Sequence, residues 1–141
     1  MAQQIILDSN ILIYAFDTTS PYNLQCSQIF NLPNIDLFIA QNSLWEFYRV
    51  MTSKAFVKTV THADLLNIIE FYQNNLKILY PTQNTDFILN DLIEKYKPRS
   101  GQIWDMLILA IAMENDINTV YTQNVKDFPE NKFIKIVDPT L

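Results

Sequence analysis

The sequence predicts an α/β fold in which a central parallel sheet of about four to five short strands carries helices on both faces. Short apolar runs alternate with longer segments whose apolar residues recur at helical spacing, as in domains built from strand–helix–strand units. The stretch 5–16 shows this best: Ile-Ile-Leu precedes Asp8, Ser9 and Asn10, and apolar residues then resume without alternation. We interpret it as a buried strand that turns into a helix at Asp8, with Ser9 or Asn10 supplying the helix start.

The other elements follow from similar runs and from their flanking polar residues. Thr61 is expected to cap one helix and Asn42 or Ser43 another, while Pro98 and Gly101 end the helix before them. We expect further strands at 36–40, 77–80, 119–122 and 133–137, and helices at 22–32, 44–51, 62–74, 84–96 and 103–114. The core-facing stripes are expected to be Leu44, Phe47, Tyr48 and Met51; Leu65, Leu66, Ile69 and Tyr72; and Phe87, Ile88, Leu92 and Tyr96.

The composition fits one globular domain over 1–141. Of the 141 residues, 49% are hydrophobic and 18% are charged, which argues against disorder. The longest apolar stretches are interrupted by acids and are shorter than the roughly 20 residues that cross a bilayer. No secretory signal pattern opens the chain, and the only cysteine, Cys26, has no internal disulfide partner, so we expect a cytoplasmic location.

Net charge and glycine content exclude some classes of function. A net charge of −5 disfavours a protein that coats nucleic acid non-specifically, although a carboxylate site that binds a divalent metal could still cleave it. Gly101 is the only glycine, which excludes P-loop and Rossmann phosphate-binding motifs because both need several glycines.

Three acidic residues are candidates for a functional site. Asp8 follows the first strand, where it could also simply cap the helix. Asp105 lies in the apolar helix 103–114, where an ionised carboxylate is costly unless it is paired or binds metal, although a first-turn acid also gains from the helix dipole. Glu46 lies off the apolar stripe of its helix and could instead pair with Arg49.

A fourth candidate is the polar segment after the strand at 119–122, with Thr122, Asn124 and Asp127, which a polar turn would explain equally well. All four positions follow strands or begin helices at one edge of the predicted sheet, where open α/β sheets bind ligands. Carboxylates gathered there repel one another unless a hard cation such as Mg²⁺ or Mn²⁺ lies among them.

These segments resemble four motifs of a known family. Ile6-Leu-Asp8-Ser-Asn-Ile-Leu-Ile, Ser43-Leu-Trp-Glu46-Phe, Trp104-Asp105-Met-Leu-Ile-Leu-Ala and Thr122-Gln-Asn124-Val-Lys-Asp127-Phe look like the motifs of PIN-domain ribonucleases. Chain length and motif order are most like the VapC-type toxins of toxin–antitoxin pairs.

The resemblance implies a metal-dependent endoribonuclease. Asp8, Glu46 and Asp105 would hold Mg²⁺ or Mn²⁺, and water would attack the RNA phosphodiester in line, leaving a 5′-phosphate and a 3′-hydroxyl. Asn124 joins them as a catalytic residue, with Thr122 and Asp127 in support. Many relatives have aspartate in place of Asn124, so the number of metal ions stays open. The partners implied are an RNA substrate and a small antitoxin protein, together with a second copy in a homodimer.

Basic and aromatic residues near the motifs have two readings. Arg49, Lys54, Lys97 and Arg99 could contact RNA phosphates, although solvation alone explains most such side chains. Trp45 and Trp104 each precede a candidate metal ligand. They could stack on unpaired bases, but packing in the core is the simpler expectation.

Two other functions remain open from sequence. An aspartate phosphotransferase or phosphatase would use Asp8 as its nucleophile, but Asn10 stands where dehalogenase-like phosphatases want a second aspartate. A binding module could keep the fold and lack catalysis, as Asn124 would allow.

Overall fold

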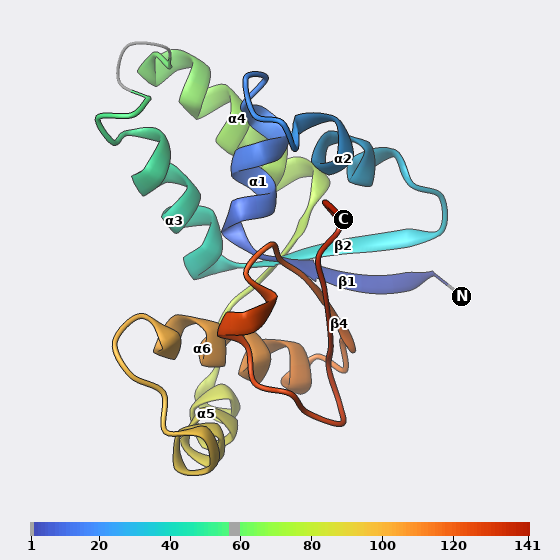
Figure 1. Ribbon diagram of the computed structural model, residues 1–141, viewed down its shortest axis with the longest axis vertical. Helices are drawn as coiled ribbons and strands as arrows, with labels where there is room; N and C mark the ends of the chain where they lie inside the picture. Colours follow the sequence, from blue (N-terminus) through green and yellow to red (C-terminus); the bar gives the residue numbers. More distant parts are fainter. Residues whose placement is uncertain (1, 57–59) are drawn as a thin grey trace.

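The computed structural model describes residues 2–56 and 60–141, in which five parallel strands form one sheet in the order β3-β2-β1-β4-β5 (Figure 1). Each strand pairs in parallel with its neighbours. The predicted parallel sheet is therefore confirmed. The strands are β1 (Gln3–Leu7), β2 (Ile35–Ala40), β3 (Lys77–Leu79), β4 (Thr119–Tyr121) and β5 (Lys135–Val137).

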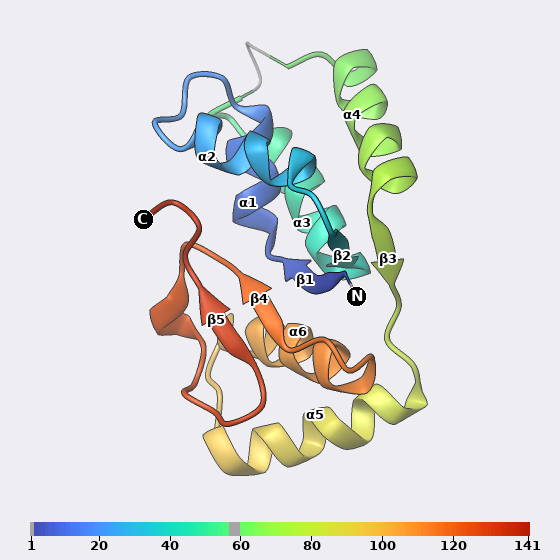
Figure 2. The ribbon, with the colours of Figure 1, turned by 90° about the vertical axis from the view of Figure 1, so that its right-hand side faces the viewer.

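Helices cover both faces of the sheet, as the sequence predicts. The first four pack on one face and the last two on the other (Figure 2). The helices are α1 (Ser9–Phe16), α2 (Asn23–Gln28), α3 (Gln41–Met51), α4 (His62–Asn75), α5 (Gln83–Tyr96) and α6 (Gln102–Glu114), with 3-10 turns at Ile29–Asn31 and Val125–Asp127. None of these helices is long and apolar enough to cross a membrane.

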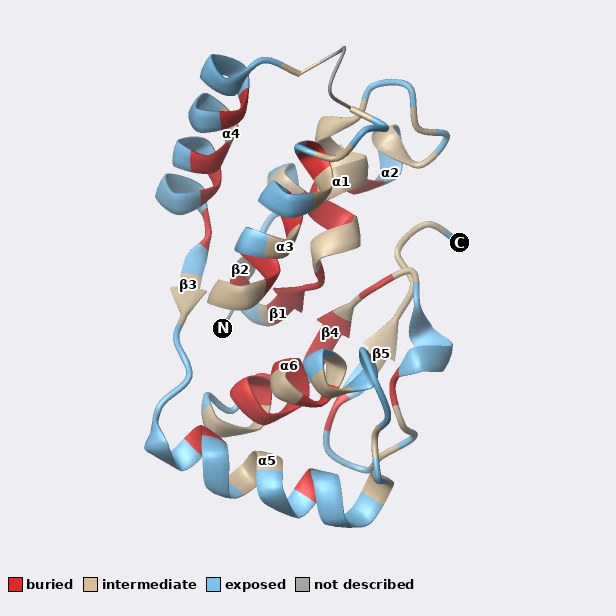
Figure 3. Ribbon diagram, turned by 90° about the vertical axis from the view of Figure 1, so that its left-hand side faces the viewer, coloured by how far each residue is buried: buried red, intermediate tan, exposed pale blue. Residues whose placement is uncertain are grey.

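The central strand β1 contributes to both cores. Ile5 and Leu7 face the core under α1 to α4, whereas Ile6 between them faces the core under α5 and α6. All three side chains are fully buried. Figure 3 shows buried residues in red in β1 and along α6. A strand covered on both faces needs apolar residues at every position, which explains the lack of alternation in its sequence.

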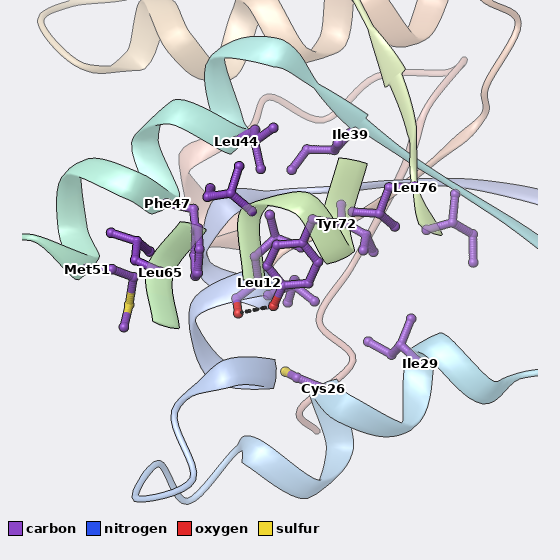
Figure 4. Packing of buried hydrophobic residues seen from close by; sticks show 14 residues of the cluster. Leu12, Cys26, Ile29, Ile39, Leu44, Phe47, Met51, Leu65, Tyr72 and Leu76 are labelled. Carbon is purple, nitrogen blue, oxygen red and sulfur yellow. Dashed lines mark hydrogen bonds between the residues drawn. The ribbon is translucent and has the colours of Figure 1, made fainter. Parts of the chain in front are cut away.

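The core under α1 to α4 is centred on aromatic packing. The Phe47 ring meets the Tyr72 ring edge-on, with 5.3 Å between the ring centroids. Tyr72 donates a hydrogen bond from its hydroxyl to the backbone carbonyl of Leu12, 2.9 Å away, which ties α4 to α1 (Figure 4). Cys26 lies in this cluster, and burial raises the pKa of its thiol to about 11.

Some local expectations are confirmed and others are wrong. Thr61 caps α4, accepting a hydrogen bond from the Asp64 amide, but α3 begins at Gln41 after Ala40 with no side-chain cap, so neither Asn42 nor Ser43 caps it. The expected stripes are too wide. Tyr48, Leu66 and Phe87 are 40%, 58% and 62% exposed because each helix contacts its neighbours over a narrower face than its apolar residues span.

The strand order creates a crevice beside β1. The chain moves outward from β1 to β2 and β3, and then returns through α5 and α6 to form β4 on the other side of β1. At such a reversal, the loops that leave the carboxyl ends of neighbouring strands diverge and leave room for a ligand. Asp8 follows β1 and Thr122 follows β4, so both stand at this reversal.

Candidate active site

Asp8 is held rigidly at the end of β1. It is the N-cap of α1, and its Oδ1 accepts a hydrogen bond of 2.8 Å from the Ser9 amide. Its Oδ2 accepts a hydrogen bond of 2.8 Å from the Thr122 hydroxyl and one of 3.3 Å from the side-chain amide of Asn10. Asp8 therefore caps the helix, as the sequence allowed, and the expectation that Ser9 or Asn10 supplies the helix start is wrong. Burial raises the pKa of the Asp8 carboxyl, and the bonds from Thr122 and Ser9 oppose that rise.

Asn10 and Thr122 link the first strand to the fourth. The Asn10 side chain donates to the Thr122 hydroxyl over 3.1 Å and accepts from the Gln123 amide over 3.2 Å. Thr122 is fully buried and also accepts from the Asn124 amide. The pair fixes the turn after β4 against Asp8. Asn10 was missed as a site residue in the sequence because its partners Thr122 and Gln123 lie more than 100 residues away.

Asp105 lies in the first turn of α6, half-buried. Burial raises the pKa of its carboxyl to about 7, and the charges of Asp8 and Asp127 add to the rise. The neighbouring carboxylates are therefore close enough to Asp105 to repel it.

Glu46 is paired with Arg49 one turn further along α3. Arg49 Nε donates to Glu46 Oε2 over 2.9 Å, and Nη2 donates to Oε1 over 2.5 Å. These hydrogen bonds hold the pKa of Glu46 below its usual value. The local pair considered for Glu46 in the sequence is thus present, although Glu46 also faces the same cleft as Asp8.

A cleft of about 1240 Å³ brings most of the predicted site together. Its lining includes Asp8, Glu46, Asp105, Asn124 and Asp127, with Arg49 and Arg99 among the basic residues. Thr122 lies behind the cleft, against Asp8. Lys54 and Lys97 do not line the cleft, and Lys97 donates to the Glu94 carbonyl instead.

The expectation that Trp45 and Trp104 pack in the core is wrong. Their side chains are 47% and 59% exposed, and both line the cleft beside the carboxylates. Position 45 lies off the buried stripe of Leu44, Phe47 and Met51, which is a sequence signal for its exposure. No such signal exists for Trp104, because α6 is apolar almost all round.

The donor set suits a hard divalent cation. Mg²⁺ and similar ions prefer carboxylate and amide oxygens, and the cleft offers Asp8, Glu46, Asp105 and Asp127 together with Asn124. In the described ranges, no three acidic, histidine or cysteine side chains already stand in a cation-binding group. Glu46 would have to leave Arg49 to join one. The negative charges of Asp8, Asp105 and Asp127 repel one another, and a bound cation would reduce that repulsion.

Sequence comparison decides the family. The model of the PIN domain matches residues 5–134, which is nearly the whole chain. The chain belongs to the PIN-domain family. No curated protein sequence matches this PIN domain.

Solved structures share the fold of this PIN domain. VapBC-1 of nontypeable Haemophilus influenzae is 20% identical with a TM-score of 0.70, covering 99% of this chain and 100% of the other. VapBC of Salmonella typhimurium, solved bound to DNA, is 23% identical with a TM-score of 0.65 and 99% of both chains covered. VapC20 of Mycobacterium tuberculosis, described as a toxin that cleaves the sarcin–ricin loop, is 9% identical with a TM-score of 0.69, covering 87% and 92%.

Proposed function

We propose that this PIN domain is a metal-dependent endoribonuclease and the toxin of a toxin–antitoxin pair. The observation that carries the proposal is the single cleft that Asp8, Glu46, Asp105, Asn124 and Asp127 line at the reversal of strand order. The fold shared with VapC-type toxins supports the same reading, and VapC20 is described as cleaving the sarcin–ricin loop.

Each residue has a proposed role in the reaction. Asp8, Glu46 and Asp105 hold Mg²⁺ or Mn²⁺, with Asp8 kept in place by Thr122. When bound, such a cation offsets the charge of the phosphodiester and lowers the pKa of the attacking water. Asn124 and Asp127 face the cleft from the turn after β4, where they can accept hydrogen bonds from that water.

The basic residues of the cleft are suited to the substrate. If Glu46 held the cation, Arg49 would lose its hydrogen bonds to that carboxylate, and its guanidinium could contact a phosphate. Arg99 lines the cleft on the loop before α6. Lys54 and Lys97 have a weaker case, because they lie outside the lining.

The proposed partners follow from the fold and from exposed apolar residues. One solved structure with the same fold is a toxin–antitoxin complex from Klebsiella pneumoniae, so we propose a small antitoxin for this chain. The toxin would act in the cytoplasm. Leu24, Leu66 and Phe71 are exposed on α2 and α4, and they support the proposed homodimer.

RNA cleavage under controlled metal conditions tests the proposal. We expect the purified protein to cut a labelled RNA that has paired and unpaired segments in Mg²⁺ or Mn²⁺, and to leave it intact in EDTA. The products should carry 5′-phosphates, which a 5′-phosphate-dependent exonuclease detects. Asp8→Asn should abolish cleavage, whereas Asp91→Asn, an exposed change on α5, should leave it unchanged. Cleavage that persists in EDTA would argue against a metal-dependent reaction.

The same assay separates the alternatives. Asn10 stands two residues after Asp8, where a dehalogenase-like phosphatase would want a second aspartate, which disfavours Asp8 as a phosphoryl acceptor. A phospho-aspartate trapped on Asp8 would nevertheless revive a phosphotransferase. RNA that binds without turnover at any Mn²⁺ concentration would indicate a binding module.

A further inference from the structure

Two exposed indoles flank the acidic cleft. Trp45 and Trp104 are the only tryptophans in the chain, and they are 47% and 59% exposed. Tryptophan is usually well buried, so two large exposed rings in one cleft need an explanation. Each stands one residue before a proposed metal ligand, Glu46 in α3 and Asp105 in α6.

The two indoles approach the cleft from opposite sides of the sheet. The buried side chains of α3 pack in the core with α1 and α4, and those of α6 pack in the core on the other face. The two helices accordingly lie on either side of the sheet (Figure 2). Trp45 and Trp104 therefore reach the cleft from helices on opposite faces of the sheet.

The surroundings favour a nucleic-acid strand over a protein partner. Two-thirds of the residues that line the cleft are polar or charged, including Asn42, Ser43 and Gln102, and these side chains can form hydrogen bonds with a nucleic-acid strand. Its volume of about 1240 Å³ exceeds the roughly 300–1,000 Å³ of typical small-molecule sites. Aromatic rings combined with basic side chains, here the two arginines Arg49 and Arg99 of the cleft lining, are typical of sites that bind single strands.

We infer that Trp45 and Trp104 stack on two unpaired bases of the RNA, one on each side of the scissile phosphodiester. This inference rests on the proposed function and specifies its substrate: the strand is unpaired at the cut, because base faces within a helix are not free to stack. The carboxylates line the same cleft as the two rings, so bases stacked on the rings would hold the strand over the carboxylates.

Tryptophan fluorescence provides a direct measurement. Because the chain has no other tryptophan, its indole emission comes from the cleft alone. In the Asp8→Asn background, which prevents cutting, we expect a single-stranded RNA decamer to quench this emission. An abasic decamer of the same length, which keeps the phosphates and lacks the bases, should quench it little and bind more weakly.

Substitution of each ring gives the matched test. Stacking contributes about 1–3 kcal/mol per base, so Trp45→Ala and Trp104→Ala should each weaken binding of the decamer about 5- to 150-fold, measured by anisotropy of a labelled strand. Phenylalanine at either position should retain much of the affinity, because its ring can still stack. Phe87→Ala removes an equally exposed ring on α5 outside the cleft and should change nothing.

The possible failures are distinguishable. A decamer that binds equally well to the alanine variants, or an abasic decamer that binds as tightly as the RNA, would overturn the stacking inference while leaving a nuclease intact. The rings would then be free for a protein contact. RNA that does not bind at all would overturn both proposals. Base-dependent binding in a wild-type protein that never cleaves RNA would support stacking and overturn only the nuclease.

Discussion

Replacing Asp105 with asparagine is expected to lower RNA cleavage at least about 100-fold and also to stabilise the metal-free protein above pH 7. Loss of a residue that hydrogen-bonds to a metal ligand typically lowers metal affinity or activity about 10- to 100-fold. Loss of a proposed ligand itself should therefore lower activity more. Stability should rise because the asparagine side chain carries no charge to desolvate beside Asp8 and Asp127.

The pH dependence of this stability effect has a definite sign. In the folded protein the pKa of Asp105 is about 7, above its ordinary value of 3.8, so the folded state holds this proton more tightly than the unfolded state does. Its contribution to stability is complete below pH 4 and is lost as the pH rises through 7. The melting temperature of Asp105→Asn should therefore match that of wild type near pH 4 and exceed it by a few degrees at pH 8.

Thermal unfolding in EDTA at several pH values measures this difference, with cleavage assayed on the same preparations. Asp91→Asn is the control, because it removes an equal charge from the exposed surface of α5. If the Asp105→Asn protein cuts RNA at the wild-type rate, Asp105 has no role in the cleavage reaction. A melting temperature with the same pH profile as wild type would contradict the raised pKa.

Replacing Thr122 with valine is expected to lower the free energy of unfolding by about 1–3 kcal/mol and to slow cleavage about 10- to 100-fold. The fully buried hydroxyl donates to Asp8 and accepts from the Asn124 amide, and valine does neither. Without the hydroxyl, the pKa of Asp8 should rise further, because the Thr122 bond is the largest effect that lowers it. The acidic limb of the cleavage pH profile should move to higher pH accordingly.

Urea unfolding and the pH profile of cleavage provide the measurements, and Thr122→Ser is the matched control. Serine keeps the hydroxyl and loses only a methyl group, so its pH profile should follow wild type. If valine and serine give the same profile, Thr122 supports the fold without positioning Asp8.

The sequence predicts the fold well because burial on two faces leaves a clear pattern. The apolar run at Ile5 to Leu7 indicates a central strand, and the structure places it between two cores. Helix faces are less predictable, since periodicity shows which side is apolar without showing how wide the neighbouring surface is. Leu66 and Phe87 are exposed for this reason. The single-domain organisation over 1–141 stays a prediction.

The candidate site is partly predictable because strand ends and helix starts fix Asp8 and Asp105 in sequence. The contacts around them are not, since Asn10 and Thr122 meet only after β4 has paired with β1. The paired state of Glu46 depends on the rotamers of two exposed side chains, and the exposure of Trp104 depends on how α6 packs. Sequence therefore indicates the acidic residues of the cleft, but it favours core packing for Trp45 and Trp104, which line that cleft instead.

Mn²⁺ binding tests the central claim, that Asp8, Glu46 and Asp105 share one cation, most directly. Free Mn²⁺ can be followed by electron paramagnetic resonance as each protein is titrated with the metal. The proteins compared are wild type and the Asp8→Asn, Glu46→Gln, Asp105→Asn and Asp91→Asn variants. We expect wild type and Asp91→Asn to bind alike and each of the other three to bind at least about 10-fold more weakly, with cleavage following occupancy. Equal Mn²⁺ affinity in all five proteins would contradict the shared site.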